Sequence, residues 1–241
     1  MDLAIIPFGE QAVRVIFGDR IDPSIQAQIS RFLRYFDRLP FPGFIEYVPA
    51  YTNIAFYYDP QKVLVGVHGG QTAQQTVIDY LEACYTAMDR EPCADERIER
   101  RTVRIPVCYG GAFGPDLDVV ASYHQMSTEE VIRRHTAPEY LVYMLGFAPG
   151  FPFLGGLPEE LATPRRESPR LKIAAGSVGI AGRQTGAYPL QSPGGWQIIG
   201  RTPTQLFTPD GQSPTLLHAG DLVRFESITE EQFLAQKGGQ L

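Results

Sequence analysis

The chain has 241 residues, 44% of them hydrophobic and 20% charged, which excludes an intrinsically disordered chain and predicts one or two globular domains. Its formal net charge of −6 argues against a general nucleic-acid-binding protein. The 24 glycines and 20 prolines favour short strands joined by tight turns over long helices.

The first 88 residues have the pattern of a small α+β domain. In chain order we expect strands over 3–6 and 12–17, a helix over 23–38, strands over 45–49 and 53–58, and a helix over 72–88. Asp22 and Pro23 begin the first helix, as its N-cap residue and its first helical residue. The order β-β-α-β-β-α predicts two helices over one antiparallel sheet, a small open sandwich.

A charged segment over 89–101 predicts a linker from this domain (1–88) to a second domain over 102–241. Beyond Pro138, short apolar runs separated by glycine and proline are typical of a closed β-barrel. The elements expected in this domain are strands over 102–108, 140–145, 173–180, 187–191, 197–201 and 222–225, and helices over 116–123 and 127–135. The sequence therefore predicts an α+β protein, an open sandwich followed by a barrel.

Positive charge is concentrated in one part of the second domain. The segment 161–209 carries a net charge of +5, and the rest of the chain carries −11. Arginine outnumbers lysine 18 to 3, and its planar guanidinium suits bidentate contact with a carboxylate or a phosphate. This pattern indicates an anion-binding site, but solvated loop arginines, or arginines paired with acids from elsewhere, would produce it too.

Three segments of the second domain are candidate site elements. Residues 146–157 place three phenylalanines among glycines and prolines, and such a stiff loop suits either a pocket wall or the packing of a barrel end. Residues 164–170 form a short cationic loop held by two prolines. Residues 192–203 contain the single tryptophan, Trp196, beside a glycine pair, where it fits core packing or a pocket wall.

Several common site motifs are absent from the sequence. There is no P-loop, no Gly-x-Gly-x-x-Gly and no Gly-x-Ser-x-Gly, and the four histidines lack metal-ligand spacing, so we expect no metal site. Three cysteines, an odd number without metal spacing, favour reduced thiols in the cytoplasm. The longest uncharged run, 140–158, is broken by glycines and prolines that disfavour a membrane-spanning helix.

Five motifs of the second domain follow one another in a fixed order. They are Gly-Phe-x-Pro-Gly-Phe at 146–151, Pro-Arg-Arg-x-x-Pro-Arg at 164–170, Ala-Gly-Ser-Val-Gly-Ile-Ala-Gly at 175–182, Ser-Pro-Gly-Gly-Trp at 192–196 and Ile-Gly-Arg-Thr-Pro at 199–203. Together they resemble the family that contains the B subunit of 5-oxoprolinase, also called the kinase A inhibitor (KipI) or allophanate hydrolase subunit 1 family. The resemblance covers nearly the whole chain, and its one departure is Ala174, where the pattern has proline.

The resemblance implies an N-terminal α+β domain and a cyclophilin-like β-barrel, in agreement with the patterns above. It also implies an ATP-hydrolysing enzyme that opens 5-oxo-L-proline to L-glutamate together with two partners, the C subunit of 5-oxoprolinase, which is the larger barrel protein, and its A subunit. ATP, with Mg, would be bound jointly with these partners. Phosphoryl transfer depends on positioning and cationic groups, for which the arginines of this domain are candidates.

Candidate site residues follow from the motifs and from this chemistry. Catalytic roles are expected for Arg165, Arg166, Arg170, Ser177 and Arg201. Substrate-binding roles are expected for Phe147, Pro149, Phe151, Gln184, Ser192 and Trp196. We expect the guanidinium groups and the aromatic rim to converge at the mouth of the barrel. Glu167 and Asp221 are weaker candidates for a general base, and Asp221 also fits a turn residue that caps backbone N–H groups.

Two other functions stay open. Some family members are implied to inhibit a sporulation histidine kinase, in which case the apolar wall at 147–153 would hold a proline-bearing helix of the kinase. The same modules occur in urea carboxylase, so a subdomain of a biotin-dependent carboxyltransferase is the third interpretation. The chain has no Met-Lys-Met biotin-attachment motif, consistent with a biotin carrier elsewhere.

Overall fold

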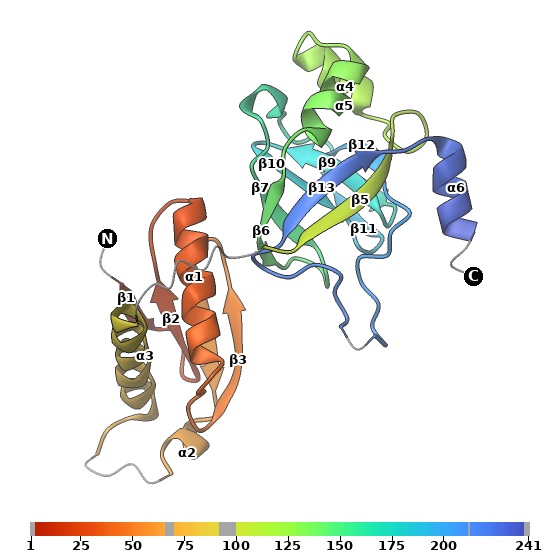
Figure 1. Ribbon diagram of the computed structural model, residues 1–241. Coiled ribbons are helices and arrows are strands. Elements are labelled where there is room, and N and C mark those ends of the chain that lie inside the picture. Colours follow the sequence, from red (N-terminus) through yellow and green to blue (C-terminus); the bar gives the residue numbers. More distant parts are fainter. Residues whose placement is uncertain (1–2, 66–69, 92–99, 212, 239–241) are drawn as a thin grey trace. The chain divides into compact units, whose positions relative to one another are not determined.

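The computed structural model describes residues 3–65, 70–91, 100–211 and 213–238, and the chain forms two compact units, Met1–Glu99 and Arg100–Leu241 (Figure 1). Most of the expected linker, 92–99, and with it Cys93, lies outside the described residues. Of the helices that the structure describes, none is both long and apolar enough to cross a membrane.

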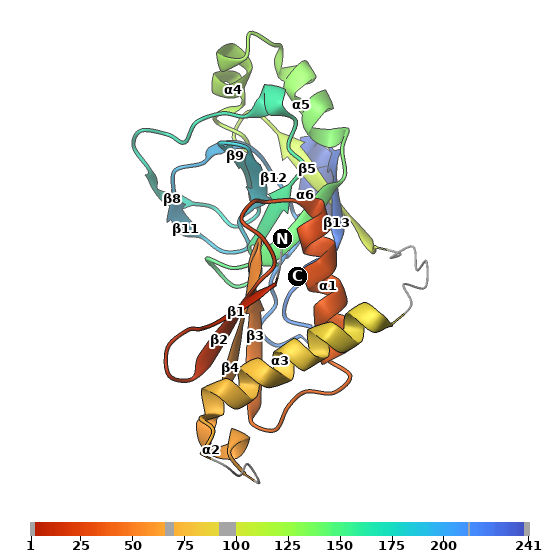
Figure 2. The same cartoon turned by 90° about the vertical axis from the view of Figure 1, so that its left-hand side faces the viewer.

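The first unit is the open sandwich that the sequence predicts. Its elements are β1 (Ala4–Pro7), β2 (Ala12–Ile16), α1 (Pro23–Phe36), β3 (Phe44–Pro49), β4 (Asn53–Tyr58), α2 (Pro60–Val63) and α3 (Ala73–Arg90). The strands form one antiparallel sheet in the order β1-β2-β4-β3, and α1 and α3 lie against one face of it (Figures 1 and 2). The α+β prediction for this part of the chain is confirmed.

Side-chain caps and aromatic packing explain this unit. Asp22 caps α1 by accepting from the Ser24 backbone N–H at 2.8 Å, as expected, and Thr72 caps α3. The rings of Phe32 and Phe36 on α1 pack edge-on against Phe56 of β4, at centroid distances of 6.1 and 4.9 Å. The buried faces of these helices are therefore core.

The second unit is a closed barrel, again as predicted. Its elements are β5 (Thr102–Tyr109), α4 (Leu117–Tyr123), α5 (Thr128–Thr136), β6 (Tyr140–Leu145), β7 (Pro152–Gly155), the 3₁₀ helix η1 (Glu159–Leu161), β8 (Arg170–Ile173), β9 (Ser177–Ala181), β10 (Gln184–Ala187), β11 (Ser192–Gly194), β12 (Gln197–Arg201), β13 (Leu222–Ser227) and α6 (Glu230–Gly238). The barrel order is β10-β7-β6-β13-β5-β12-β9, closed by the β9–β10 pair. A separate two-stranded ribbon, β8–β11, stands beside it (Figure 2).

Two strand predictions in this unit are wrong. The expected strand 173–180 is two strands of different sheets, because Gly176 turns the chain with a φ of 82° and lies so close to Thr202 that a Cβ would be 2.3 Å from its carbonyl oxygen. The expected strand 187–191 is shifted to Gln184–Ala187, and the chain leaves the sheet before Pro189, which has no N–H to pair. The turn at Gly176 separates the β8–β11 ribbon from the barrel.

A buried hydrogen-bond chain crosses the barrel core through His135, which has no exposed surface. The Thr185 hydroxyl donates to the Gly179 carbonyl oxygen at 3.0 Å, so it accepts from His135 Nε2 at 2.9 Å. His135 Nδ1 is then the acceptor for the Tyr109 hydroxyl at 2.8 Å. Every member is satisfied by a neutral imidazole, and burial lowers the pKa of His135 to about 3.

This histidine makes the stability of the fold depend on pH. Below the ordinary pKa of 6.5, His135 binds a proton in the unfolded chain, whereas in the folded chain it stays neutral down to about pH 3. The free energy of unfolding therefore decreases as pH falls through this range, by up to about 1.4 kcal/mol per pH unit from this group. Denaturant unfolding between pH 7 and 4 should show a steeper decrease for the wild type than for His135→Gln. Equal slopes in the two proteins would contradict this, and His124→Gln is the control that should keep the wild-type slope.

Candidate functional site

An aromatic cluster lies on the outer side of the barrel wall, apart from the barrel core. It centres on Phe151, whose ring meets those of Tyr188 and Trp196 edge-on at 5.3 and 5.5 Å. Ile198 of β12 belongs to this cluster, and the next residue, Ile199, belongs to the barrel core, as strand alternation requires. Trp196 is 7% exposed, so it is a core residue of this outer cluster.

The loop between β6 and β7 extends this cluster to the surface. Phe147 is 70% exposed, yet its ring contacts that of Phe151 at 5.6 Å, and Pro149 is exposed on the same loop. The backbone of Phe147 has a φ of 67°, a conformation that is costly for a bulky residue. A hollow of about 340 Å³ lies at this loop. The structure thus brings the predicted residues Phe147, Phe151 and Trp196 together.

The cationic loop is fixed to the barrel by one buried carboxylate, that of Asp116, which is 2% exposed. Arg166 Nη1 donates to it at 2.9 Å, and Arg170 donates through Nη1 and Nη2 at 2.7 and 2.8 Å. The backbone N–H of Ile198 donates to the same carboxylate at 2.7 Å. Two guanidinium groups and one carboxylate leave this cluster with a net charge of +1. Both arginines pair with Asp116, and the buried Nε of Arg166 has no hydrogen-bond partner among the described residues.

Arg201 and Ser177 lie elsewhere on the barrel. They are opposite each other in the β9–β12 pair, and Arg201 Nε donates to the Ala175 carbonyl oxygen at 2.8 Å. Arg201 is three residues along β12 from Ile198, about 10 Å away. The arginines that the sequence suggests as one group therefore do not converge here, and their catalytic roles stay a prediction.

The remaining predicted residues lie near the aromatic cluster. Ser192 of β11 is opposite Ile173, a member of the cluster, and its buried hydroxyl has no hydrogen-bond partner in the described part of the chain. Gln184 is opposite Ala181, another member of the cluster, in the β9–β10 pair. Arg165 is exposed and makes no ion pair with any residue that the structure describes.

Ser213, His218 and Asp221 lie close together, and their residue types are those of a hydrolytic triad. Their hydrogen bonds do not have the triad's geometry. Arg101 donates to His218 Nδ1 at 3.0 Å and also pairs with Asp221. Nδ1 is therefore the acceptor and Nε2 holds the proton, so His218 has no lone pair for the Ser213 hydroxyl 3.4 Å away. Asp221 also accepts from the His218 backbone N–H at 2.8 Å, the capping role expected for it, and its role as a base stays a prediction.

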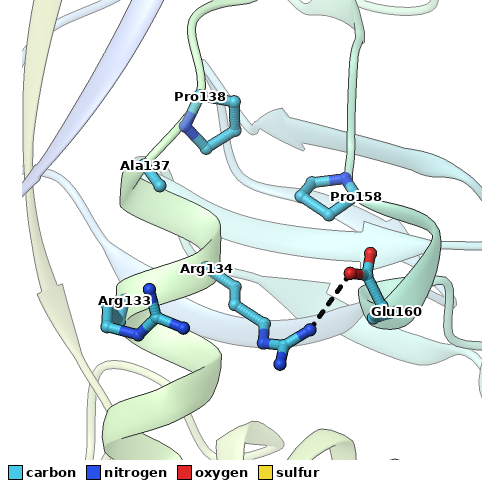
Figure 3. Close-up of a pocket in the computed structure, with 6 residues that line it drawn as sticks. All are labelled: Arg133, Arg134, Ala137, Pro138, Pro158 and Glu160. Carbon is cyan, nitrogen blue, oxygen red and sulfur yellow. Dashed lines mark hydrogen bonds and ion pairs between the residues drawn. The ribbon is translucent and has the colours of Figure 1, made fainter.

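An open hollow of about 520 Å³ lies between α5 and η1 (Figure 3). Its lining residues are Arg133, Arg134, Ala137, Pro138, Pro158 and Glu160. Arg134 pairs with Glu160 at 3.1 Å, and Glu130 accepts from both arginines at 2.6 Å. Both lining arginines and the lining glutamate are therefore engaged in ion pairs with described residues.

Two residues that matter in this region were not predicted, Asp116 and Tyr188. Asp116 follows proline just before a helix and has the sequence pattern of an N-cap, yet it forms no side-chain cap. Its real partners are at least 50 residues away, which no local pattern reveals. Tyr188 precedes a proline in a turn, where an aromatic residue carries no functional signal.

Removing the Asp116 carboxylate should be strongly destabilising, because it leaves Arg166 and Arg170 without their shared acceptor. We expect Asp116→Ala to lower the free energy of unfolding by about 3 kcal/mol, the size typical of a broken buried pair. Asp118→Ala, an exposed residue in the first turn of the same helix, should change it by less than about 1 kcal/mol. Chemical denaturation of the three proteins at pH 7 measures both effects. Similar losses in the two variants would show that Asp116 is only a helix residue.

The chain is similar to known proteins in sequence. A family model for the carboxyltransferase domain, subdomain C and D, matches residues 3–217. The B subunit of 5-oxoprolinase from Bacillus subtilis is 47% identical over 234 residues, 95% of this chain and 94% of that protein. The similarity therefore extends over both units of the chain.

Solved structures show the same architecture. A conserved uncharacterized protein of Pyrococcus horikoshii, PH0987, is 42% identical, covers 95% of this chain and all of that chain, and superposes with a TM-score of 0.55. The protein TTHA0988 superposes with a TM-score of 0.76 at 34% identity over 90% of this chain, which spans only 40% of that longer chain. The chain therefore belongs to the carboxyltransferase subdomain C and D family, and within it to the B subunits of 5-oxoprolinase.

Proposed function

We propose that this chain is part of an ATP-dependent 5-oxoprolinase, which hydrolyses 5-oxo-L-proline to L-glutamate with cleavage of ATP. The observation that carries the proposal is the match to a B subunit of 5-oxoprolinase along 95% of this chain and 94% of that protein. The match is end to end, so it includes both units and all the segments of the outer aromatic cluster.

The chemistry explains why such an enzyme needs anion-binding groups. The lactam of 5-oxoproline is an unactivated amide, and phosphorylation of its carbonyl oxygen by ATP would make the carbon a better target for water. Positioning and cationic stabilisation dominate phosphoryl transfer. Among the described residues no three His, Cys, Asp or Glu side chains cluster as metal ligands, so we assign no step to a metal held by this chain.

The proposed enzyme also contains partner proteins. In TTHA0988 the part related to this chain is 40% of a longer polypeptide, so additional protein is covalently attached to it there. We infer that this chain binds the corresponding protein as separate polypeptides, namely the C subunit of 5-oxoprolinase, the larger barrel protein, and its A subunit. ATP, with Mg, is then bound jointly with these partners.

The proposal is tested by reconstitution with each of the three proteins omitted in turn. The complete mixture should release one glutamate for each ATP hydrolysed, and omission of this chain should reduce glutamate release to background. Glutamate release that is unchanged without this chain, or that needs no ATP, would overturn the proposal. Addition of the purified chain back to the depleted mixture is the control for loss of a partner during preparation.

A further inference from the structure

Three polar groups at the outer aromatic cluster make no hydrogen bond or ion pair with the residues that the structure describes. They are the guanidinium of Arg165, the hydroxyl of Tyr188 and the hydroxyl of Ser192. Buried polar groups are nearly always hydrogen-bonded, and an orphan one needs an explanation. Ser192 Oγ is fully buried, and Tyr188 is only 2% exposed.

The Tyr188 hydroxyl is held rigidly beneath the β8–β11 ribbon. Its backbone is fixed by hydrogen bonds to both sides of the turn, Tyr188 N–H to the Ser177 oxygen at 2.8 Å and Gly176 N–H to the Tyr188 oxygen at 2.7 Å. Its ring packs edge-on against Phe151. Gly194 of the ribbon approaches so closely that a Cβ there would lie 2.6 Å from Tyr188 Oη.

Ser192 and Arg165 belong to the same small region. Ser192 is opposite Ile173 in the ribbon, and a Cβ on Gly194 would lie 2.7 Å from Ile173 Cδ1 and 2.6 Å from Tyr188 Oη, so Gly194 and Ile173 meet beside the Tyr188 hydroxyl. The residue after Arg165 is bound to the end of the ribbon by the Arg166 N–H, which donates to the Gly195 oxygen at 2.8 Å. The positive charge of Arg165 acts on Tyr188, whose pKa burial nevertheless raises to about 12, so the phenol remains a donor at neutral pH.

We propose that Arg165, Tyr188 Oη and Ser192 Oγ form a binding site for one small carboxylate, with the aromatic cluster packed against the rest of the ligand. One guanidinium and two neutral hydroxyl donors match a single negative charge and its acceptor oxygens. Resting on the proposed function, this assigns the site to the carboxylate of 5-oxoproline. It also assigns Tyr188 as a specificity residue of this chain.

The same charges exclude the ATP phosphates from this site. A triphosphate carries several negative charges, whereas Arg166 and Arg170 are already shared with Asp116 and Arg201 lies about 10 Å along β12. The ATP phosphates are therefore held by groups outside this site. Changes at this site should therefore affect 5-oxoproline and not ATP, which makes the proposal testable.

The ligand reaches the buried hydroxyl when the ribbon shifts. A two-stranded ribbon is marginally stable without further packing, and the pairing of β8 with β11 is irregular between Ser192 and Gly194. Leu171 of β8 is 90% exposed, so part of the ribbon packs against nothing in the described chain. Displacement of the ribbon changes little at Leu171, whereas Ile173 of the same strand is buried in the cluster and is uncovered by it.

The single tryptophan provides a direct test with the full chain, because Trp196 lies within the cluster. Its fluorescence should change saturably with 5-oxo-L-proline and not with pyrrolidin-2-one, the same lactam without the carboxylate. Arg165→Gln and Tyr188→Phe should each weaken 5-oxoproline binding by about tenfold or more, since each removes a hydrogen bond to a charged group. Arg183→Gln, another exposed arginine of the cationic segment, should bind as the wild type does.

The reconstituted enzyme separates the two substrates. Arg165→Gln and Tyr188→Phe should raise the KM for 5-oxoproline by about tenfold and leave the KM for ATP unchanged. A raised KM for ATP, wild-type values for both substrates, or a saturable fluorescence response to pyrrolidin-2-one would overturn the site.

Failure of the proposed function gives a different result. A complete mixture with no ATP-dependent glutamate release overturns the enzyme proposal alone. The carboxylate site would then still be supported by a Trp196 signal that requires the carboxylate and is lost in both variants. Absence of this signal together with unchanged KM values overturns the site. Tyr188→Phe keeps the buried ring, and Arg165 is exposed, so both variants should fold.

Discussion

The buried carboxylate of Asp116 determines what the cationic part of this protein is able to do. A charge buried to this extent is stable only when charged hydrogen bonds compensate its lost hydration. Here two guanidinium groups and one backbone N–H provide the compensation. The same contacts join the start of α4, the loop before β8 and strand β12, so one side chain positions three segments that are far apart in the sequence.

The contacts of Asp116 with Arg166 and Arg170 destabilise helix α4 locally, which shows that these tertiary contacts outweigh the helix cap. Asp116 is the N-cap residue of α4 but makes no cap hydrogen bond, a loss of about 1 kcal/mol for the helix. Its carboxylate turns instead to Arg166 and Arg170. Because these two arginines pair with Asp116, Arg165 is the arginine of the loop that remains available, and its charge acts on Tyr188.

The sequence predicts those parts of the structure that depend on near neighbours. Caps such as Asp22, the helical periodicity of α1 and the glycine-rich spacing of the barrel strands all act within a few residues, and the architecture they predict is confirmed. The aromatic wall is also largely local, since Phe147 and Phe151 share a loop. Neither the turn at Gly176 nor the partners of the arginines are local: the first depends on the close approach of Thr202, and the second on an acid 50 residues away.

This division between committed and available cations bears on why the chain would need partners. A reaction that brings a carboxylate and a triphosphate together must balance several negative charges, and the outer cluster of this chain offers one unpaired guanidinium for them. The remaining charge has to be met by groups outside this cluster. In the relative TTHA0988 the same fold is only 40% of a longer polypeptide, so additional protein is attached to it there. On the proposed function, a binding half-site for the uncharged lactam and its carboxylate is the contribution that we assign to the described residues.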